Sequence, residues 1–217
     1  MLKSVSPPLE LAFDRLAATP VATDPFPHVV VPNFVPPDEL RAIVSGLPEM
    51  SSGGSFPPSA LSLRPEAQAL VRALEGPRLR EAIAAKFGLD LRDAPTMLTL
   101  RGRTREKDGR VHTDSTAKRV TILLYLNPAT EAWSRQEGCL RLLRRPDDIE
   151  DYAVEVPPVD GTLLVFPNGP TTWHGHRQYV GRRYAIQLNY METGAKARSE
   201  IRRHKLSAIV KRFSSAR

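Results

Sequence analysis

The sequence predicts a mainly β fold, a sandwich or barrel, with helices on its N-terminal side and one closing helix. Between about residues 95 and 191, short β-branched or alternating apolar runs are separated by turn residues, with no helical pattern between them. Apolar spacing is helical before residue 90 and again after Gly194. A chain of 217 residues, 41% hydrophobic and 25% charged, is large and apolar enough to bury a core.

The N-terminal part contains many of the 20 prolines. Residues 1–23 show no clear pattern, and we expect them to form a flexible lead-in. The β-branched run 28–31, bounded by Pro27 and Pro32, predicts a short strand. Helical spacing, with proline suited to first turns and glycine suited to helix ends, predicts helices after it. They cover residues 38–47, 65–75 and 77–87.

Seven strands are predicted in the second half of the chain. They cover residues 96–101, 110–114, 118–126, 138–143, 162–166, 171–176 and 183–191. We therefore expect residues 24–194 to form a single domain. Its helical support would span about 37–90 and its β core about 95–191.

Nothing in the sequence points to an oxidising compartment or a membrane. The single cysteine, Cys139, has no partner for an internal disulfide and is expected to act as a small buried hydrophobe. No signal-peptide pattern is visible, and no apolar run approaches the roughly 20 residues that span a bilayer. We expect a cytoplasmic protein.

The net charge of +7 is concentrated at one end of the chain. Residues 195–217 carry eight Lys or Arg against Glu200 alone, which accounts for the whole excess. We expect a basic C-terminal helix, either a solvated surface or a contact for an acidic partner or a second copy of the chain. No base-flipping wedge or aromatic stacking motif supports nucleic-acid binding.

A candidate metal site begins with His112 and Asp114. Residues i and i+2 of a strand point to the same face, so these two side chains can bind one ion. An imidazole and a carboxylate suit iron(II), and a second imidazole would complete a facial triad with open positions. His174 and His176, far along the chain, are the candidates for that third ligand.

Four motifs, in order, resemble the prolyl 4-hydroxylase-like branch of the 2-oxoglutarate/iron(II) dioxygenases. They span about residues 95–191. They are the strand Val120 to Asn127, the run Glu137 to Leu142, the strand Gly161 to Pro167, and the segment Trp173 to Tyr190, and they follow His112-Thr113-Asp114. In that branch, a basic residue that opens the last core strand follows the distal histidine by about nine residues. Arg183 stands nine residues after His174.

The resemblance implies a double-stranded β-helix, or jelly roll, with His112, Asp114 and His174 as iron ligands. It implies Fe(II), 2-oxoglutarate and O2 as reactants, with ascorbate as a reductant. The reaction would couple decarboxylation of 2-oxoglutarate to succinate and CO2 with hydroxylation of a C–H bond. The substrate would be prolyl or peptidyl, or a small metabolite.

The resemblance also implies the co-substrate residues. Arg183, favoured over Arg182 by the spacing, presents a guanidinium fork to the distal carboxylate. Tyr125 is the candidate phenol for the same carboxylate. Several family members have a tyrosine about ten residues before the first ligand, where this chain has Arg101-Gly102-Arg103, so the co-substrate pocket would use a different donor.

Two questions stay open on the sequence alone. The polar segment 102–110 is either a mobile lid over the site or a solvated hairpin loop. The main alternative function is a non-catalytic jelly-roll binding module, although the intact triad and Arg183 argue against it. A cupin-type enzyme usually has more histidines in the first strand pair than the one found here.

Overall fold

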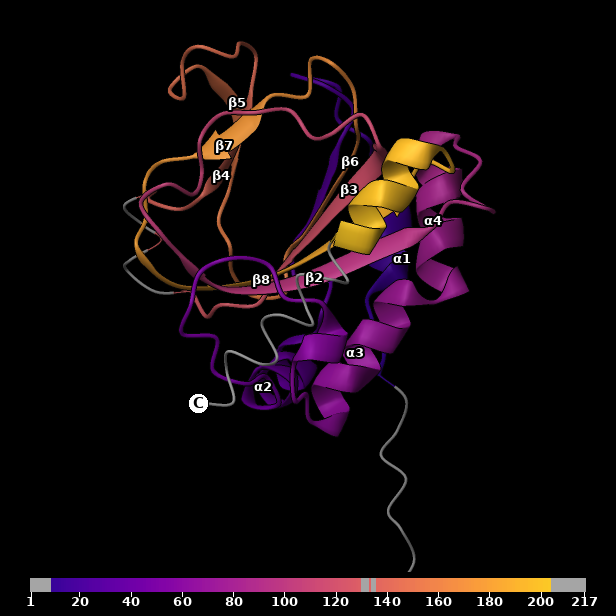
Figure 1. The fold of residues 1–217 in the computed structure, drawn as a ribbon, viewed down its shortest axis with the longest axis vertical. Coiled ribbons are helices and arrows are strands. Elements are labelled where there is room, and N and C mark those ends of the chain that lie inside the picture. The colour runs from indigo at the N-terminus through magenta and orange to yellow at the C-terminus, as the bar shows by residue number, and fades with distance from the viewer. Residues whose placement is uncertain (1–8, 130–132, 134–135, 204–217) are drawn as a thin grey trace, which may run out of the picture.

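The computed structural model describes residues 9–129, 133 and 136–203. Two antiparallel sheets form the core, and helices flank one of them (Figure 1). The larger sheet has the order β1-β6-β3-β8-β2, and the smaller sheet has the order β5-β4-β7. The strands are β1 (Val29–Val31), β2 (Thr96–Thr104), β3 (Lys118–Tyr125), β4 (Leu140–Leu143), β5 (Tyr152–Val156), β6 (Leu163–Pro167), β7 (His174–His176) and β8 (Gly181–Met191).

Four α-helices and a short 3-10 turn precede the main strands. They are α1 (Phe13–Ala18), α2 (Pro37–Ser45), η1 (Pro58–Ala60), α3 (Pro65–Glu75) and α4 (Pro77–Phe87). Proline opens α2, α3 and α4, because a first-turn residue needs no N–H partner and proline already has a helical φ. Gly88 ends α4 in the left-handed conformation, with φ 64°.

Strand alternation divides the apolar side chains into two clusters. On β3, Val120, Ile122 and Leu124 face the helices and join the larger cluster, which lies between α1–α4 and the outer face of the five-stranded sheet. Tyr125 and other alternate residues face the space between the two sheets, where a smaller cluster includes Phe166 and Leu142. The same inner face also carries buried polar side chains, such as Thr121 of β3 and Asn189 of β8.

The predicted mainly β jelly roll with flanking helices is confirmed, although the sheets do not close into a barrel. Helices α3 and α4 have the predicted bounds. The strand predicted over 110–114 is wrong: its pairing is a single bridge between His112 and His174. Strand β5 was not predicted, and the stretch taken as a lead-in contains α1, whose Leu16 is buried.

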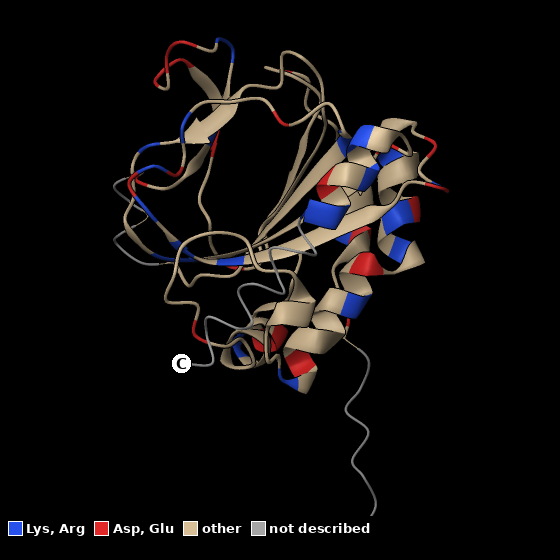
Figure 2. Cartoon of the chain, in the orientation of Figure 1, with Lys and Arg blue, Asp and Glu red and all other residues tan. Residues whose placement is uncertain are grey.

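The predicted C-terminal helix is described only in part. Residues 195–203 are helical, and residues 204–217 lie outside the described residues. Figure 2 shows that the described part carries both basic and acidic positions. No helix in the described part of the chain is long and apolar enough to cross a membrane.

Candidate metal and co-substrate site

His112, Asp114 and His174 lie together at one end of the space between the sheets. Each offers a ligand atom, and these atoms lie within 4.8 Å of one another. His174 comes from β7, while His112 and Asp114 come from the segment between β2 and β3. The His112–His174 bridge joins the two segments, with backbone N···O distances of 3.0 Å in both directions.

Backbone carbonyls fix the tautomer of both histidines. Nδ1 of His112 lies 2.8 Å from the carbonyl of Arg110, and Nδ1 of His174 lies 2.9 Å from that of Thr172. Because a carbonyl oxygen only accepts, each Nδ1 must carry the proton, which leaves the Nε2 lone pair free. Burial lowers the pKa of His174 to about 4, so its imidazole is neutral near pH 7.

Asp114 is held as a carboxylate by two donors. Lys118 Nζ lies 2.5 Å from Oδ1, and Thr121 Oγ1 donates to Oδ2 at 2.6 Å. Burial raises the pKa of Asp114, but the charge of Lys118 and these hydrogen bonds outweigh it, and the pKa is lowered. Two imidazoles and one carboxylate fit the facial donor set of a non-haem iron(II) ion.

Neighbouring elements support the Asp114 segment. Thr121 is fully buried, and its hydroxyl also accepts from Asn168 Nδ2 at 2.9 Å. Ser115 Oγ donates to Glu200 Oε1 at 2.6 Å, which ties the residue after Asp114 to the helix 195–203. Ala197 of that helix is buried in a cluster with Met191. No sequence pattern indicated that this helix contacts the candidate site.

His176 does not join the other ligands. Its ring packs against Gly109, where an added Cβ would lie 2.4 Å from the ring and where φ is 90°. Its Nδ1 lies 2.8 Å from the carbonyl of Arg177. Of the two histidines that the sequence left open, the structure brings His174 to His112 and Asp114.

The candidate co-substrate residues lie farther along the same space. Arg183 is buried, its Nε donates to the Gly138 carbonyl at 2.9 Å, and its guanidinium carbon lies 5.2 Å from the ring centroid of Tyr125. The Tyr125 hydroxyl is buried and has no hydrogen-bond partner among the described residues. Arg182 is exposed and lies over Tyr184, with its guanidinium carbon 4.8 Å from the ring centroid.

The segment 102–110 is partly strand. β2 continues to Thr104, and a turn follows in which Asp108 accepts from the backbone N–H of Arg105 at 2.8 Å. The carbonyl of Gly109 then accepts from the His176 backbone at 2.9 Å. Both ends of the segment are therefore tied to the core, as in the hairpin interpretation rather than the lid.

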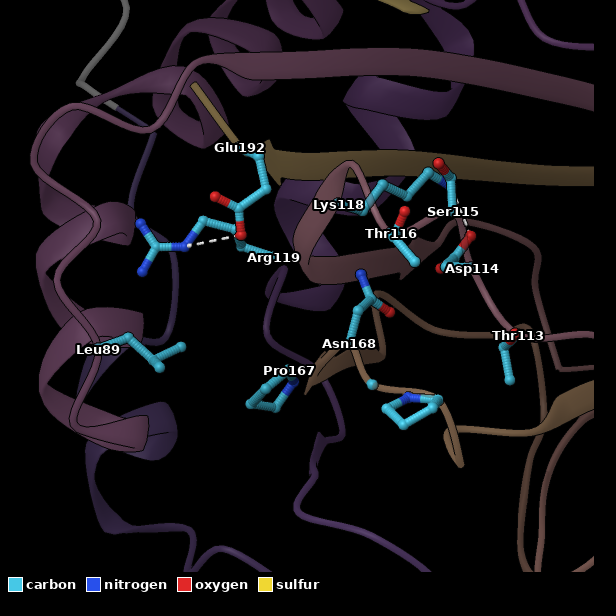
Figure 3. A pocket seen from close by; sticks show the side chains of 12 residues that line it. Leu89, Thr113, Asp114, Ser115, Thr116, Lys118, Arg119, Pro167, Asn168 and Glu192 are labelled. Atoms are coloured by element: carbon cyan, nitrogen blue, oxygen red, sulfur yellow. Dashed lines mark hydrogen bonds and ion pairs between the residues drawn. The ribbon is translucent and has the colours of Figure 1, made fainter. Parts of the chain in front are cut away.

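A pocket of about 370 Å³ borders Asp114. Figure 3 shows Asp114 and Lys118 on one side and Arg119 and Glu192 on the other. Arg119 pairs with Glu192 at 3.7 Å, and Lys118 pairs with Asp114. Of the three candidate metal ligands, only Asp114 lines this pocket, while His112 is exposed to solvent.

Residues 101–191 match the sequence profile of the 2OG-Fe(II) oxygenase superfamily. The matched segment, which is less than half of the chain, resembles that superfamily. The matched residues include all three candidate iron ligands of the oxygenase core, as well as Tyr125 and Arg183. No curated protein sequence matches the chain.

Solved structures show the same fold. A Pseudomonas putida prolyl 4-hydroxylase aligns with TM-score 0.56 and 22% identity over 84% of this chain and 91% of its own. A Phytophthora capsici prolyl 4-hydroxylase gives 0.58 and 17%, over 87% and 68%. A viral collagen prolyl hydroxylase of Paramecium Bursaria Chlorella virus-1 gives 0.52 and 14%, over 81% and 94%. These likenesses show that the chain shares the fold of the prolyl 4-hydroxylases, the branch whose motifs the sequence resembles.

Proposed function

We propose that this chain is an iron(II)- and 2-oxoglutarate-dependent dioxygenase. It would couple oxidative decarboxylation of 2-oxoglutarate to succinate and CO2 with hydroxylation of a C–H bond. The observation that carries the proposal is the grouping of His112, Asp114 and His174, with both Nε2 atoms free and the carboxylate ionised. A bound iron(II) would supply the activation of O2.

Each residue has a role that its surroundings support. His112 and His174 would bind the metal through Nε2, since their Nδ1 atoms are occupied by carbonyls. Thr121 would keep the Asp114 carboxylate oriented through its hydrogen bond to Oδ2. Arg183 would bind the distal carboxylate of 2-oxoglutarate, and the unpartnered Tyr125 hydroxyl would donate to it.

The substrate class in this proposal is a prolyl or peptidyl group, or a small metabolite. Prolyl hydroxylases are prominent among the proteins of similar fold, which supports the first class. The exposed His112 gives a substrate access to the metal from solvent. Ascorbate as reductant, a cytoplasmic location and a partner for the basic C-terminal helix belong to the proposal on the strength of the sequence alone.

The decisive test is an anaerobic titration of iron(II) and 2-oxoglutarate into metal-free protein. A chelated 2-oxo acid on iron(II) gives a weak visible charge-transfer band. We expect the band with the wild-type chain and its loss with His174→Ala. Folded protein that gives no band would overturn the proposal and leave a non-catalytic jelly-roll binding module as the better account.

A further inference from the structure

Arg101 shares a face with the candidate co-substrate residues. Across three neighbouring strands, Tyr125 of β3 pairs with Ala185 of β8, and Ala185 pairs with Arg101 of β2. Leu98 and Leu100 face the helices, so Arg101 faces the space between the sheets with Tyr125 and Ala185. The small Ala185 side chain leaves room between the arginine and the phenol.

Arg183 lies two residues from Ala185 on β8 and is therefore diagonal to Arg101. Diagonal neighbours on adjacent strands lie about 7–8 Å apart, within reach of two long side chains. Crowding by protein atoms lowers the pKa of Arg101, and repulsion from Arg183 lowers it further, although the residue remains accessible to solvent. Two like charges are thus brought together on one surface.

Most hydrogen-bond donors of Arg101, Arg183 and Tyr125 have no acceptor among the described residues. Among the described residues, no hydrogen bond or ion pair engages the Arg101 guanidinium, and Arg183 uses only its Nε. The Tyr125 hydroxyl has no partner either. Arg101 is exposed, so water can serve its donors, but buried donors such as those of Arg183 and Tyr125 are normally paired. The fully buried Arg141 shows the usual pattern, with ion pairs to Glu150 and Glu155.

We propose that Arg101 and Arg183 together hold the distal carboxylate of 2-oxoglutarate, with the Tyr125 hydroxyl as a third donor. This two-arginine clamp rests on the proposed function and adds a binding residue to it. Each guanidinium presents a planar fork of N–H donors, so the two arginines together can donate to both oxygens of one carboxylate.

The position of the clamp agrees with the length of the co-substrate. Thr121, which contacts Asp114, lies four residues before Tyr125 on β3. That is about 13 Å along the strand. A five-carbon diacid chelated at the metal end, together with the reach of the arginine side chains, spans this separation.

The test compares two 2-oxo acids that differ only in the distal carboxylate. Iron(II)-loaded protein is titrated anaerobically with 2-oxoglutarate and with 2-oxopentanoate, which has the same five-carbon chain. We expect Arg101→Gln to raise the Kd of 2-oxoglutarate by roughly 10- to 100-fold and to leave that of 2-oxopentanoate nearly unchanged. Arg101→Lys, which keeps the charge without the fork, should give a smaller rise.

Arg103→Gln is the matched control, because Arg103 lies two residues on and lines a surface pocket with Arg182 and Tyr184. It should change neither Kd. Unchanged 2-oxoglutarate binding in Arg101→Gln, with weakened binding in Arg183→Gln, would overturn the clamp and leave the proposed function standing. Equal weakening for both acids would mean a structural role and would also overturn it. Absence of the band in the wild-type chain would overturn both proposals.

Discussion

Lys118 Nζ lies 2.5 Å from Asp114 Oδ1, so the carboxylate expected to bind a metal is already paired with a cation. Both side chains are largely buried. The pair stabilises the metal-free protein, and a divalent ion at Asp114 would meet the repulsion of the ammonium.

We therefore expect Lys118→Met to lower the Tm of the metal-free protein by on the order of 5–10 °C. Saturating Mn(II) should raise the Tm of this variant more than it raises that of the wild type, because the metal replaces the missing cation. Thermal unfolding with and without Mn(II) measures both effects. Arg119→Met, at a more exposed neighbour, serves as control. Equal Mn(II)-induced shifts in wild type and Lys118→Met would contradict this account.

The two histidines of β7 should differ in their effect on metal binding, because only His174 is assigned as a ligand. Replacing a ligand should abolish 2-oxoglutarate turnover, as we expect for His112→Ala, Asp114→Ala and His174→Ala. Each variant should also weaken Mn(II) binding by more than about 100-fold, which exceeds the usual loss when a residue that only hydrogen-bonds to a ligand is replaced. His176→Ala should keep metal affinity within a few-fold, since its ring packs on Gly109. Calorimetric titration with Mn(II) measures these affinities. Wild-type affinity in His174→Ala would refute the assignment.

Thr121 should affect metal affinity only through its hydrogen bond to Asp114. Thr121→Val removes the 2.6 Å hydrogen bond to Oδ2, and we expect Mn(II) affinity to fall about tenfold. Thr99→Val tests a buried threonine that has no hydrogen bond to Asp114. A similar loss of affinity in both variants would show that the Asp114 contact is not the cause.

The two adjacent arginines of β8 should differ in their effect on 2-oxoglutarate. Arg183→Gln should raise its Kd by roughly 10- to 100-fold, because a charge-assisted contact is lost from a buried position. Arg182→Gln should have little effect, since Arg182 lies over Tyr184 on the outer side. Anaerobic titration of the iron(II)-loaded variants gives both values, and the reverse order would move the assignment to Arg182.

The smaller sheet contains a buried ion cluster. Arg141, fully buried, contacts Glu155 at 2.7 Å and Glu150 at 2.8 Å. We expect Arg141→Ala to lower the free energy of unfolding by about 3–5 kcal/mol, because Glu155 keeps its charge without a partner. Arg145→Ala, which breaks an exposed pair, should change stability little. Urea denaturation compares the two, and similar small losses would mean that water replaces the Arg141 contacts.

Local signals explain what the sequence could predict. Prolines in the first turn and glycines after the last mark α3 and α4, and those bounds are confirmed. The spacings within His112-Thr113-Asp114 and from His174 to Arg183 are short separations along the sequence, so they can be recognised without the structure. The structure places those residues together, although His112 and Asp114 lie outside any regular strand.

Features that depend on distant contacts were missed. β5 is largely half-buried and pairs only with β4, so its residues carry little apolar alternation. α1 has only six residues, too few for a periodic pattern. Arg141 was not singled out because arginine is seldom fully buried. The clamp position of Arg101 follows from pairing with Ala185, which lies 84 residues away along the chain.

The larger apolar cluster lies outside the space between the sheets, against the helices. Most of the clustered buried apolar residues are thus separated from the side chains that are expected to face a ligand. Substitutions between the sheets can alter which molecules bind while the molecule stays above its folding threshold. Because of this separation, residues on the inner surface can be substituted, by evolution or by design, while the apolar cluster under the helices maintains the stability of the fold.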